Sequence, residues 1–326
     1  MSKRLPAFGV LAIGVIVLIV LFANNLFTVG SSFEQLTDEF RPIMTTASID
    51  AAKADVKALG DVSDEFSNQV APALAGALQM SPADLNAFLG TNFPAVAAGV
   101  AALPDIVPQF TGVVNLLGEQ QSNFESADAI PTSSLPATTV PWIILLIGVG
   151  AVVVSVIMWR RTRFAWLIAV GFGVLVVVFT VGLSFLPKSA AADDMNAALK
   201  PVYNEQLVAG ATQSLGVVGA MGDQMSTQML PALSQQLGMD EATMQGFLSQ
   251  FPATAAALQN LPEMKGRFQA LVTAFDSQLD NYNTIKDTAL NPIALVVLVA
   301  GLLIIVCGAW SFMADRKEPE PATDEK

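Results

Sequence analysis

The sequence has no histidine and only one cysteine, Cys307, among its 326 residues. The absence of histidine excludes Ser-His-Asp triads, histidine general bases and every metal site with a histidine ligand. Cys307 lies inside an apolar stretch, so the polar segments can form neither a disulfide nor a thiolate metal site. A glycine-rich phosphate loop is also missing, because Gly171-Phe172-Gly173 has no Walker or Rossmann context. We therefore expect no enzymatic activity, catalytic residue, cofactor or metal.

Charge is scarce as well. Charged residues make up 13% of the chain and hydrophobic residues 53%, whereas soluble domains carry about 25% charge. Four uncharged stretches each approach the roughly 20 residues with which a helix crosses a membrane. The first stretch is too long for the apolar region of a cleaved signal peptide, so we interpret it as an uncleaved anchor. The stretches predict transmembrane helices at 7–29, 140–159, 164–186 and 292–314.

The basic residues outside these stretches indicate the orientation. They fall in three clusters: Lys3 and Arg4, then Arg160, Arg161 and Arg163, then Arg316 and Lys317. Four spans place all three clusters on one side, which the positive-inside rule assigns to the cytoplasm. The sequence thus predicts a multi-pass protein of the plasma membrane with cytoplasmic segments at 1–6, 160–163 and 315–326, the last being a disordered tail. Both termini are predicted to be cytoplasmic.

Two long acidic segments are predicted on the other side of the membrane. Segment 30–139 has 13 acidic and 3 basic residues, and segment 187–291 has 10 and 5. This charge argues against nucleic acid and anionic headgroups as partners, since both attract basic patches. We expect membrane lipid and other membrane or envelope proteins as partners, and a homo-oligomer is also possible from the sequence.

Self-comparison indicates a tandem repeat. Stretch 27–33 (FTVGSSF) matches stretch 179–185 (FTVGLSF) at six of seven positions, with an offset of 152. The offset is 159 between Arg41-Pro42 and Lys200-Pro201, and 158 between Phe93-Pro94 and Phe251-Pro252. The change from 152 to 159 predicts a seven-residue insertion near Leu186–Asp193. Because each unit contains two spans, the units share one orientation, and a pseudo-two-fold axis along the membrane normal is expected.

The apolar spacing in both acidic segments is helical. Ser81-Pro82 predicts a helix start, and Asp240 supplies the corresponding cap in the second segment. Phe93-Pro94 and Leu103-Pro104 predict the two ends of a short helix. The predicted fold class is an all-α integral membrane protein with four transmembrane helices, two extracytoplasmic helical-bundle domains at 30–139 and 187–291, and a parallel tandem repeat with pseudo-two-fold symmetry.

The carboxylates do not form a recognisable site. Asp61, Asp64 and Glu65 cluster in the first segment, and Asp193-Asp194 in the second, but neither has the spacing of a Ca²⁺ loop. We interpret them as solvated helix faces. The predicted spans contain no charged residue, which counts against a proton- or ion-coupled transporter.

Two further sets of residues are candidates for contacts. Small residues at four-residue spacing permit close helix packing, either within the protein or against a partner's span: Ala151, Ser155, Ala165, Ala169 and Gly173. Methionine adapts to irregular apolar surfaces, although core packing is its more common role. The residues that we consider for an apolar ectodomain surface are Met225, Met229, Phe88 and Phe247.

These observations leave three hypotheses for the function. The first is a non-enzymatic scaffold or accessory subunit of bacterial cell-envelope machinery that acts through its paired helical ectodomains. The second is a module that binds a lipid or another hydrophobic ligand and assists envelope lipid transport. The third is an extracytoplasmic sensor.

Overall fold

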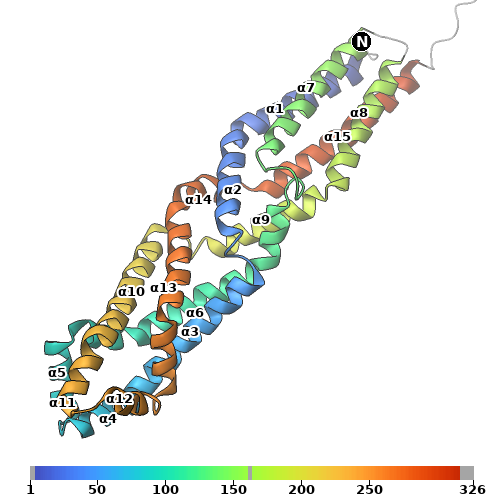
Figure 1. Cartoon of the computed structure of the whole chain (residues 1–326). Coiled ribbons are helices and arrows are strands. Elements are labelled where there is room, and N and C mark those ends of the chain that lie inside the picture. Colours follow the sequence, from blue (N-terminus) through green and yellow to red (C-terminus); the bar gives the residue numbers. More distant parts are fainter. Residues whose placement is uncertain (1–3, 161–163, 316–326) are drawn as a thin grey trace, which may run out of the picture. The chain divides into compact units, whose positions relative to one another are not determined.

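The computed structural model describes residues 4–160 and 164–315, and these ranges are helical except for short connections (Figure 1). Lys3, Arg161, Arg163, Arg316 and Lys317 lie outside the described residues. The helices in chain order are α1 Leu5–Ala23, α2 Leu26–Phe40, α3 Thr46–Glu65, η2 Phe66–Val70, α4 Ala71–Ala77, α5 Pro82–Asn92, α6 Pro94–Asp128, α7 Thr139–Trp159, α8 Ala165–Gly182, α9 Phe185–Leu199, α10 Glu205–Gln224, η3 Met225–Met229, α11 Leu230–Leu237, α12 Glu241–Leu248, α13 Pro252–Ser277, α14 Leu279–Ile285 and α15 Leu290–Asp315. The elements η2 and η3 are π-helices.

The chain divides into two compact units. The first unit consists of Met1–Asp38, Ser122–Ala198 and Asp280–Lys326, and the second of Glu39–Gln121 and Leu199–Leu279. Each unit therefore contains parts of both halves of the chain. The sequence suggests a separate bundle for each acidic segment, whereas the structure combines the two segments in the second unit, because their apolar faces share one core.

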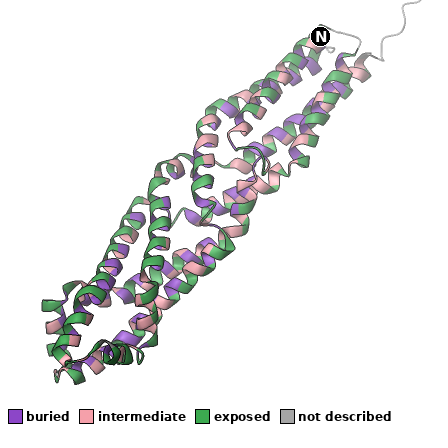
Figure 2. Ribbon diagram, viewed as in Figure 1, coloured by how far each residue is buried: buried purple, intermediate pink, exposed green. Residues whose placement is uncertain are grey.

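Within residues 4–160 and 164–315, five helices are long and apolar enough to cross a membrane: α1, α6, α7, α8 and α15. The most apolar windows of α1, α7, α8 and α15 have mean hydropathies of 2.4 to 2.9, whereas that of α6 reaches 1.4. The four more apolar helices belong to the first unit and expose many large apolar side chains. Figure 2 shows the exposed positions along these helices in green. In the described part of the second unit, the only such exposed side chain is Leu207, at 44%.

The first unit pairs α1 with α7 and α8 with α15. Both pairs approach closely at glycines. A Cβ atom added at Gly14 would lie 2.9 Å from the carbonyl oxygen of Gly148, and one added at Gly173 would lie 2.7 Å from that of Gly301. Glycine is therefore required at these two crossings, because a side chain would force the backbones apart.

Two of the predicted transmembrane helices end earlier in the structure than the sequence predicts. The helix predicted at 7–29 ends at Ala23, and the helix predicted at 164–186 ends at Gly182. In each case one residue in the left-handed region separates two helices: Asn25, with φ of 48°, and Ser184, with φ of 52°. A left-handed residue interrupts the α-helical ladder, so α2 and α9 begin as new helices.

The second unit is built around α3, α6, α10 and α13. At one end, η2, α5, η3 and α12 contribute to a single apolar core, whose buried members include Phe66, Val70, Leu85, Met225 and Met244. The two predicted helix caps are confirmed. Ser81 Oγ accepts a hydrogen bond from the Asp84 N–H at 3.2 Å, and Asp240 Oδ1 accepts one from the Thr243 N–H at 2.8 Å.

The helix break predicted at Leu103-Pro104 is wrong. α6 continues from Pro94 to Asp128 with Pro104 and Pro108 inside it, and α13 likewise contains Pro262. Proline removes a backbone donor, yet the apolar face of α6 stays packed, since Leu103 and Val114 are at most 1% exposed. Burial of this face compensates for the missing hydrogen bonds.

Several helix boundaries recur at a spacing of 159 residues. α3 and α10 each contain 20 residues and start 159 positions apart, and η2 and η3 each contain five residues with the same spacing. α2 and α9 both contain 15 residues, so they leave no room for the predicted seven-residue insertion. The stretches 27–33 and 179–185 also occupy different places, at the start of α2 and at the end of α8. Their similarity therefore does not mark equivalent positions.

Candidate functional site

The second unit contains a groove of about 540 Å³. It lies between the beginning of α3, the middle of α6 and the second half of α13. Most of its wall is apolar, with contributions from Pro42, Ile43, Ile49, Ala52, Val114, Leu117, Phe268, Ala270 and Leu271. Its size and lining are those of a site for a small ligand, since such sites typically measure about 300–1,000 Å³ and are mostly apolar.

Four of the five polar side chains that line the groove have partners within the protein, and the fifth, Glu39, is exposed. Arg267 donates from Nε and Nη2 to the two carboxylate oxygens of Asp55, at 2.6 and 2.7 Å. Ser48 Oγ donates to the Pro42 carbonyl at 2.8 Å, and Gln269 Nε2 donates to Thr273 Oγ1 at 3.3 Å. A ligand in this groove would therefore be held mainly by apolar contact.

The Asp55–Arg267 ion pair joins α3 to α13. The Asp55 side chain is only 8% exposed and that of Arg267 is 38% exposed. The bidentate hydrogen bond to Asp55 is the main cause that raises the pKa of Arg267 above its ordinary value. The pair fixes the two helices that form opposite walls of the groove.

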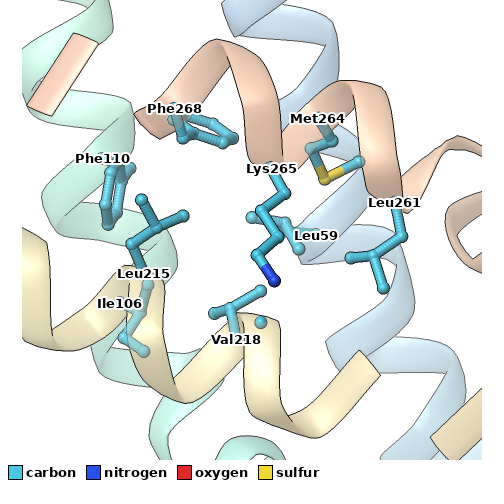
Figure 3. A pocket seen from close by; sticks show the side chains of 10 residues that line it. Leu59, Ile106, Phe110, Leu215, Val218, Leu261, Met264, Lys265 and Phe268 are labelled. Carbon is cyan, nitrogen blue, oxygen red and sulfur yellow. The ribbon is translucent and has the colours of Figure 1, made fainter. Parts of the chain in front are cut away.

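A second cavity in the same unit is too small for a ligand. It measures about 10 Å³, which is near the lower limit for one water molecule. Figure 3 shows that Phe110 and Phe268 point toward each other beside Leu215, and their ring centroids lie 5.0 Å apart. These apolar side chains form a core between α6, α10 and α13 and not a site.

Two polar side chains, the buried Glu65 and the half-buried Gln224, form reciprocal helix caps between the halves of the chain. Glu65, which is 7% exposed, accepts hydrogen bonds from the N–H groups of Ala253 and Thr254 at the start of α13, at 3.2 and 2.6 Å. Gln224 Oε1 accepts from the N–H groups of Ala95 and Val96 at the start of α6, at 2.8 and 3.1 Å. Glu65 and Gln224 are 159 positions apart. Each half thus satisfies the free donors of a helix in the other half.

The first unit has a similar pair of caps. Glu34 accepts a hydrogen bond from the Ala137 N–H just before α7. Asp193 accepts from the N–H groups of Leu290 and Asn291 at the start of α15, at 2.8 and 2.9 Å. These positions are again 159 apart. The interpretation of Glu65 and Asp193 as solvated carboxylates is therefore wrong, whereas Asp61 is exposed and pairs with Lys57.

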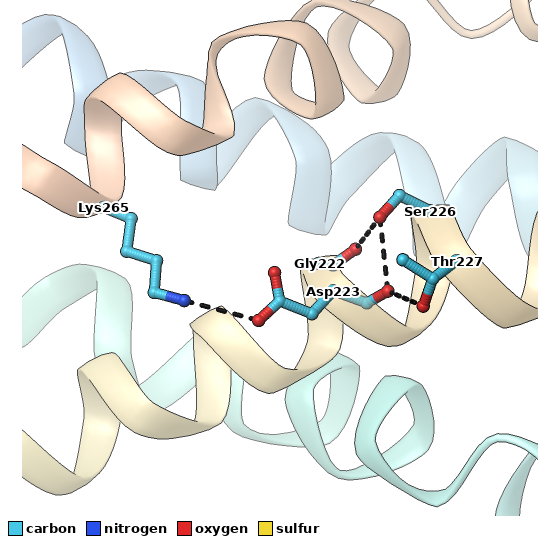
Figure 4. A network of polar contacts seen from close by, with 5 residues as sticks. All are labelled: Gly222, Asp223, Ser226, Thr227 and Lys265. Carbon is cyan, nitrogen blue, oxygen red and sulfur yellow. Dashed lines mark hydrogen bonds and ion pairs between the residues drawn. The ribbon is translucent and has the colours of Figure 1, made fainter.

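Hydroxyl groups support the π-helix η3. Figure 4 shows that Ser226 donates to the carbonyls of Gly222 and Asp223, and that Thr227 donates to the Asp223 carbonyl at 2.6 Å. In η2, Asn68 donates to the Asp64 carbonyl at 2.9 Å. A π-helix shifts the backbone ladder by one residue, so nearby carbonyls need other donors.

The half-buried Lys188 and the buried Tyr282 of the first unit have shifted pKa values. Lys188 donates to the carbonyls of Ala129 and Pro131 at 2.8 and 3.0 Å, and desolvation lowers its pKa. Tyr282 is 2% exposed, and desolvation raises its pKa to about 12, with a smaller contribution from the charge of Asp287. Lys188 lies on α9, which follows α8, and Tyr282 lies on α14, which precedes α15. Among residues 4–160 and 164–315, no cluster of three potential metal-ligating side chains occurs.

The structure places the five small-residue positions inside the first unit. Ala151, Ser155, Ala165 and Ala169 are at most 5% exposed. Ser155 Oγ donates to the Ala7 carbonyl at 2.8 Å, which links α7 to α1. Ala151, Ala165 and Ala169 belong to one buried cluster, and Gly173 lies at the crossing with α15.

The residues considered for an apolar surface do not form one. Met225 and Met229 are each 3% exposed and belong to the core at the end of the second unit. Phe88 and Phe247 are half-buried and pack against the same core. Their rings contact Phe93 and Phe251 at centroid distances of 5.8 and 5.1 Å. Helical spacing alone did not distinguish a core-facing stripe from a surface stripe.

The chain matches no protein-family model, no curated protein and no solved structure. The geometry and chemistry of its own residues are therefore the basis for a functional proposal.

Neither the groove nor the reciprocal caps were predicted from the sequence. Glu65 and Gln224 had one usable signal, because they occupy equivalent positions in the 159-residue spacing and both carry a side-chain oxygen acceptor. The groove had none. Its walls come from three helices that are distant in sequence.

Proposed function

We propose that this is a non-enzymatic, multi-pass plasma-membrane protein whose second unit binds a single apolar chain of a membrane lipid. The groove of about 540 Å³ is the observation that carries this proposal. The groove favours a ligand-binding module over a scaffold, because a protein that acts only through its surface needs no such groove. An acyl or isoprenoid chain suits walls that are mostly apolar and whose polar groups, apart from the exposed Glu39, have partners within the protein.

Four helices cross the membrane in this proposal: α1, α7, α8 and α15. Their large exposed apolar side chains support contact with lipid. α6 is the exception among the five apolar helices, because none of the large apolar side chains along its length is exposed. Its length also carries Asp105, Glu119 and Glu125. We assign α6 to the water-exposed second unit.

The basic clusters support an orientation in which both termini are cytoplasmic and the second unit is extracytoplasmic. Arg4 and Arg160, which the structure describes, flank α1 and α7. Arg4 lies over the ring of Trp159, 5.1 Å from its centroid, as is common for residues at a membrane interface. The acidic composition of 39–121 and 199–279 suits exposure to water.

A tandem duplication explains the architecture in this proposal. The equal lengths of α3 and α10, the π-helices and the caps at matching positions support it. Phe110 packs on Phe268, its own counterpart at a spacing of 158, as expected for residues beside a pseudo-two-fold axis. The two halves then form one ligand-binding unit together.

Photo-crosslinking of the purified full-length protein tests the binding proposal. The probe is lysophosphatidylcholine with a diazirine at the end of its palmitoyl chain, and peptide mapping locates the attachment. We expect crosslinks on residues 42–52 and 266–273. Ala52→Phe should reduce them about tenfold, because the ring fills the groove and a loss of about 1.4 kcal/mol lowers affinity by that factor.

Ala211→Phe is the matched control, because Ala211 is the counterpart of Ala52 on α10 and is equally half-buried. It should leave the crosslinks on 42–52 and 266–273 unchanged. Labelling confined to the apolar helices would contradict the proposal. Reproducible co-purification of envelope proteins with the unlabelled chain would then favour a scaffold or accessory subunit.

A further inference from the structure

The groove has a counterpart face on the second unit. At spacings of 159 and 158, its wall residues Pro42, Ile43, Ile49, Ala52, Val114 and Leu117 correspond to Pro201, Val202, Val208, Ala211, Val272 and Phe275. Most of these pairs are identical or similar in size. The pair Leu117 and Phe275 is different, because an aromatic ring replaces an aliphatic side chain.

Aromatic residues pack tightly on the counterpart face. Tyr203, the counterpart of Met44, is 3% exposed, and its hydroxyl donates to the Phe275 carbonyl at 2.9 Å. The ring centroids of Tyr203 and Phe275 lie 4.7 Å apart, and Phe40 lies 5.0 Å from Phe275. This cluster fills space beside Phe275, whereas Leu117 lines the open groove.

The ion pair beside the groove is also specific to one face. Asp55 and Arg267 correspond to Ser214 and Gln109, which are uncharged. The pair spans α3 and α13 at the groove, and the Arg267 side chain forms part of its wall. The counterpart helices α10 and α6 have no charged pair at these two positions.

From these differences we infer that the protein binds one lipid chain per molecule, on the face of Ala52 and Leu117, and that Tyr203 and Phe275 close the counterpart site. This inference rests on the proposed function. The aromatic side chains occupy the volume into which a chain would insert, and the Tyr203 hydrogen bond holds them in place.

Exchange of residues between the faces tests the inference. The double variant Tyr203→Met/Phe275→Leu gives the counterpart face the residues that the groove face has at the equivalent positions, Met44 and Leu117. With the same diazirine lysophosphatidylcholine, crosslinks should appear on residues 201–211 and 108–115 in addition to 42–52 and 266–273. The converse variant Met44→Tyr/Leu117→Phe should lose the crosslinks on 42–52 and 266–273 by about tenfold.

The outcomes separate this inference from the proposed function. Absence of crosslinks on either face of the unmodified protein would overturn the proposed function. Crosslinks on both faces of the unmodified protein would overturn only the inference that one site is closed. The same holds if Tyr203→Met/Phe275→Leu folds and still labels one face. If that variant does not fold, Ala211→Phe in the otherwise unmodified chain tests whether the counterpart face binds. Unchanged total labelling is expected, and a loss of half of the labelling would show that both faces bind.

Discussion

At the scale of single residues, side-chain oxygens that cap helix starts link the two halves of the second unit. Glu65 and Gln224 each accept two backbone N–H groups at the start of a helix in the other half. Phe251, at the N-cap position of α13, supplies no side-chain cap. A helix start without such an acceptor leaves N–H donors unsatisfied. These two caps therefore stabilise the packing of the two halves against each other.

Glu65→Ala should lower the free energy of unfolding by about 2 kcal/mol, because two N–H groups lose a charged acceptor. Glu65→Gln should cost less, because Gln224 performs the equivalent role with an amide. Thermal unfolding in detergent, followed by circular dichroism, measures both effects. Asp61→Ala is the control, since this exposed carboxylate pairs only with Lys57 and should matter by at most about 0.5 kcal/mol. Equal effects of Glu65→Ala and Asp61→Ala would refute the capping role.

Tyr282 should make stability depend on alkaline pH. Its pKa is about 12 in the folded protein and 10.0 without burial, so the neutral phenol is favoured by folding. This stabilisation is complete below pH 10 and is lost as the pH rises through about 12, with a magnitude of roughly 2–3 kcal/mol. Absorbance of tyrosinate during a pH titration should show one group ionising near pH 12. That transition should be absent in Tyr282→Phe, and its persistence would assign it to Tyr203 instead.

At the scale of helices, α6 decides the topology. It has the length and hydropathy of a span, yet its large apolar side chains face the core of the second unit. A fifth span would place the two termini on opposite sides of the membrane. The distinction therefore determines the location of the groove as well.

A cysteine at Gly112 distinguishes the two topologies. Gly112 is exposed near the middle of α6, and a Cβ atom there meets nothing within 4 Å. In a Cys307→Ala background, Gly112→Cys should react with a membrane-impermeant maleimide on intact cells. Leu146→Cys, at a position that is 69% exposed on α7, should not react, because lipid covers it. Protection of both cysteines would indicate that α6 crosses the membrane.

Much of the helical structure was predictable because its signals are local. Ser81 and Asp240 start helices as their side chains predict, and uncharged stretches locate α7 and α15 to within two residues at their starts. Local signals failed where packing or a single backbone angle decides. Pro104 does not end α6, and Asn25 divides a continuous apolar stretch into two helices.

At the scale of the whole molecule, the sequence could not show how the two acidic segments combine. Their apolar faces predict burial but not a partner, and the partner is the other segment. The same limit applies to the groove, whose walls meet only when α13 packs against α3. Contacts between distant helices have no spacing signature in the sequence.

The reciprocal caps have a consequence for the history of the chain. A protein with only the first half would have the Glu65 carboxylate but not the start of α13 that it caps. It would also have the start of α6 but not the Gln224 amide that caps it. Under the duplication proposed above, two copies of such a half would cap each other's helix starts, as the subunits of a homodimer would. Independent mutation of the two halves would then account for Arg267 at the position equivalent to Gln109.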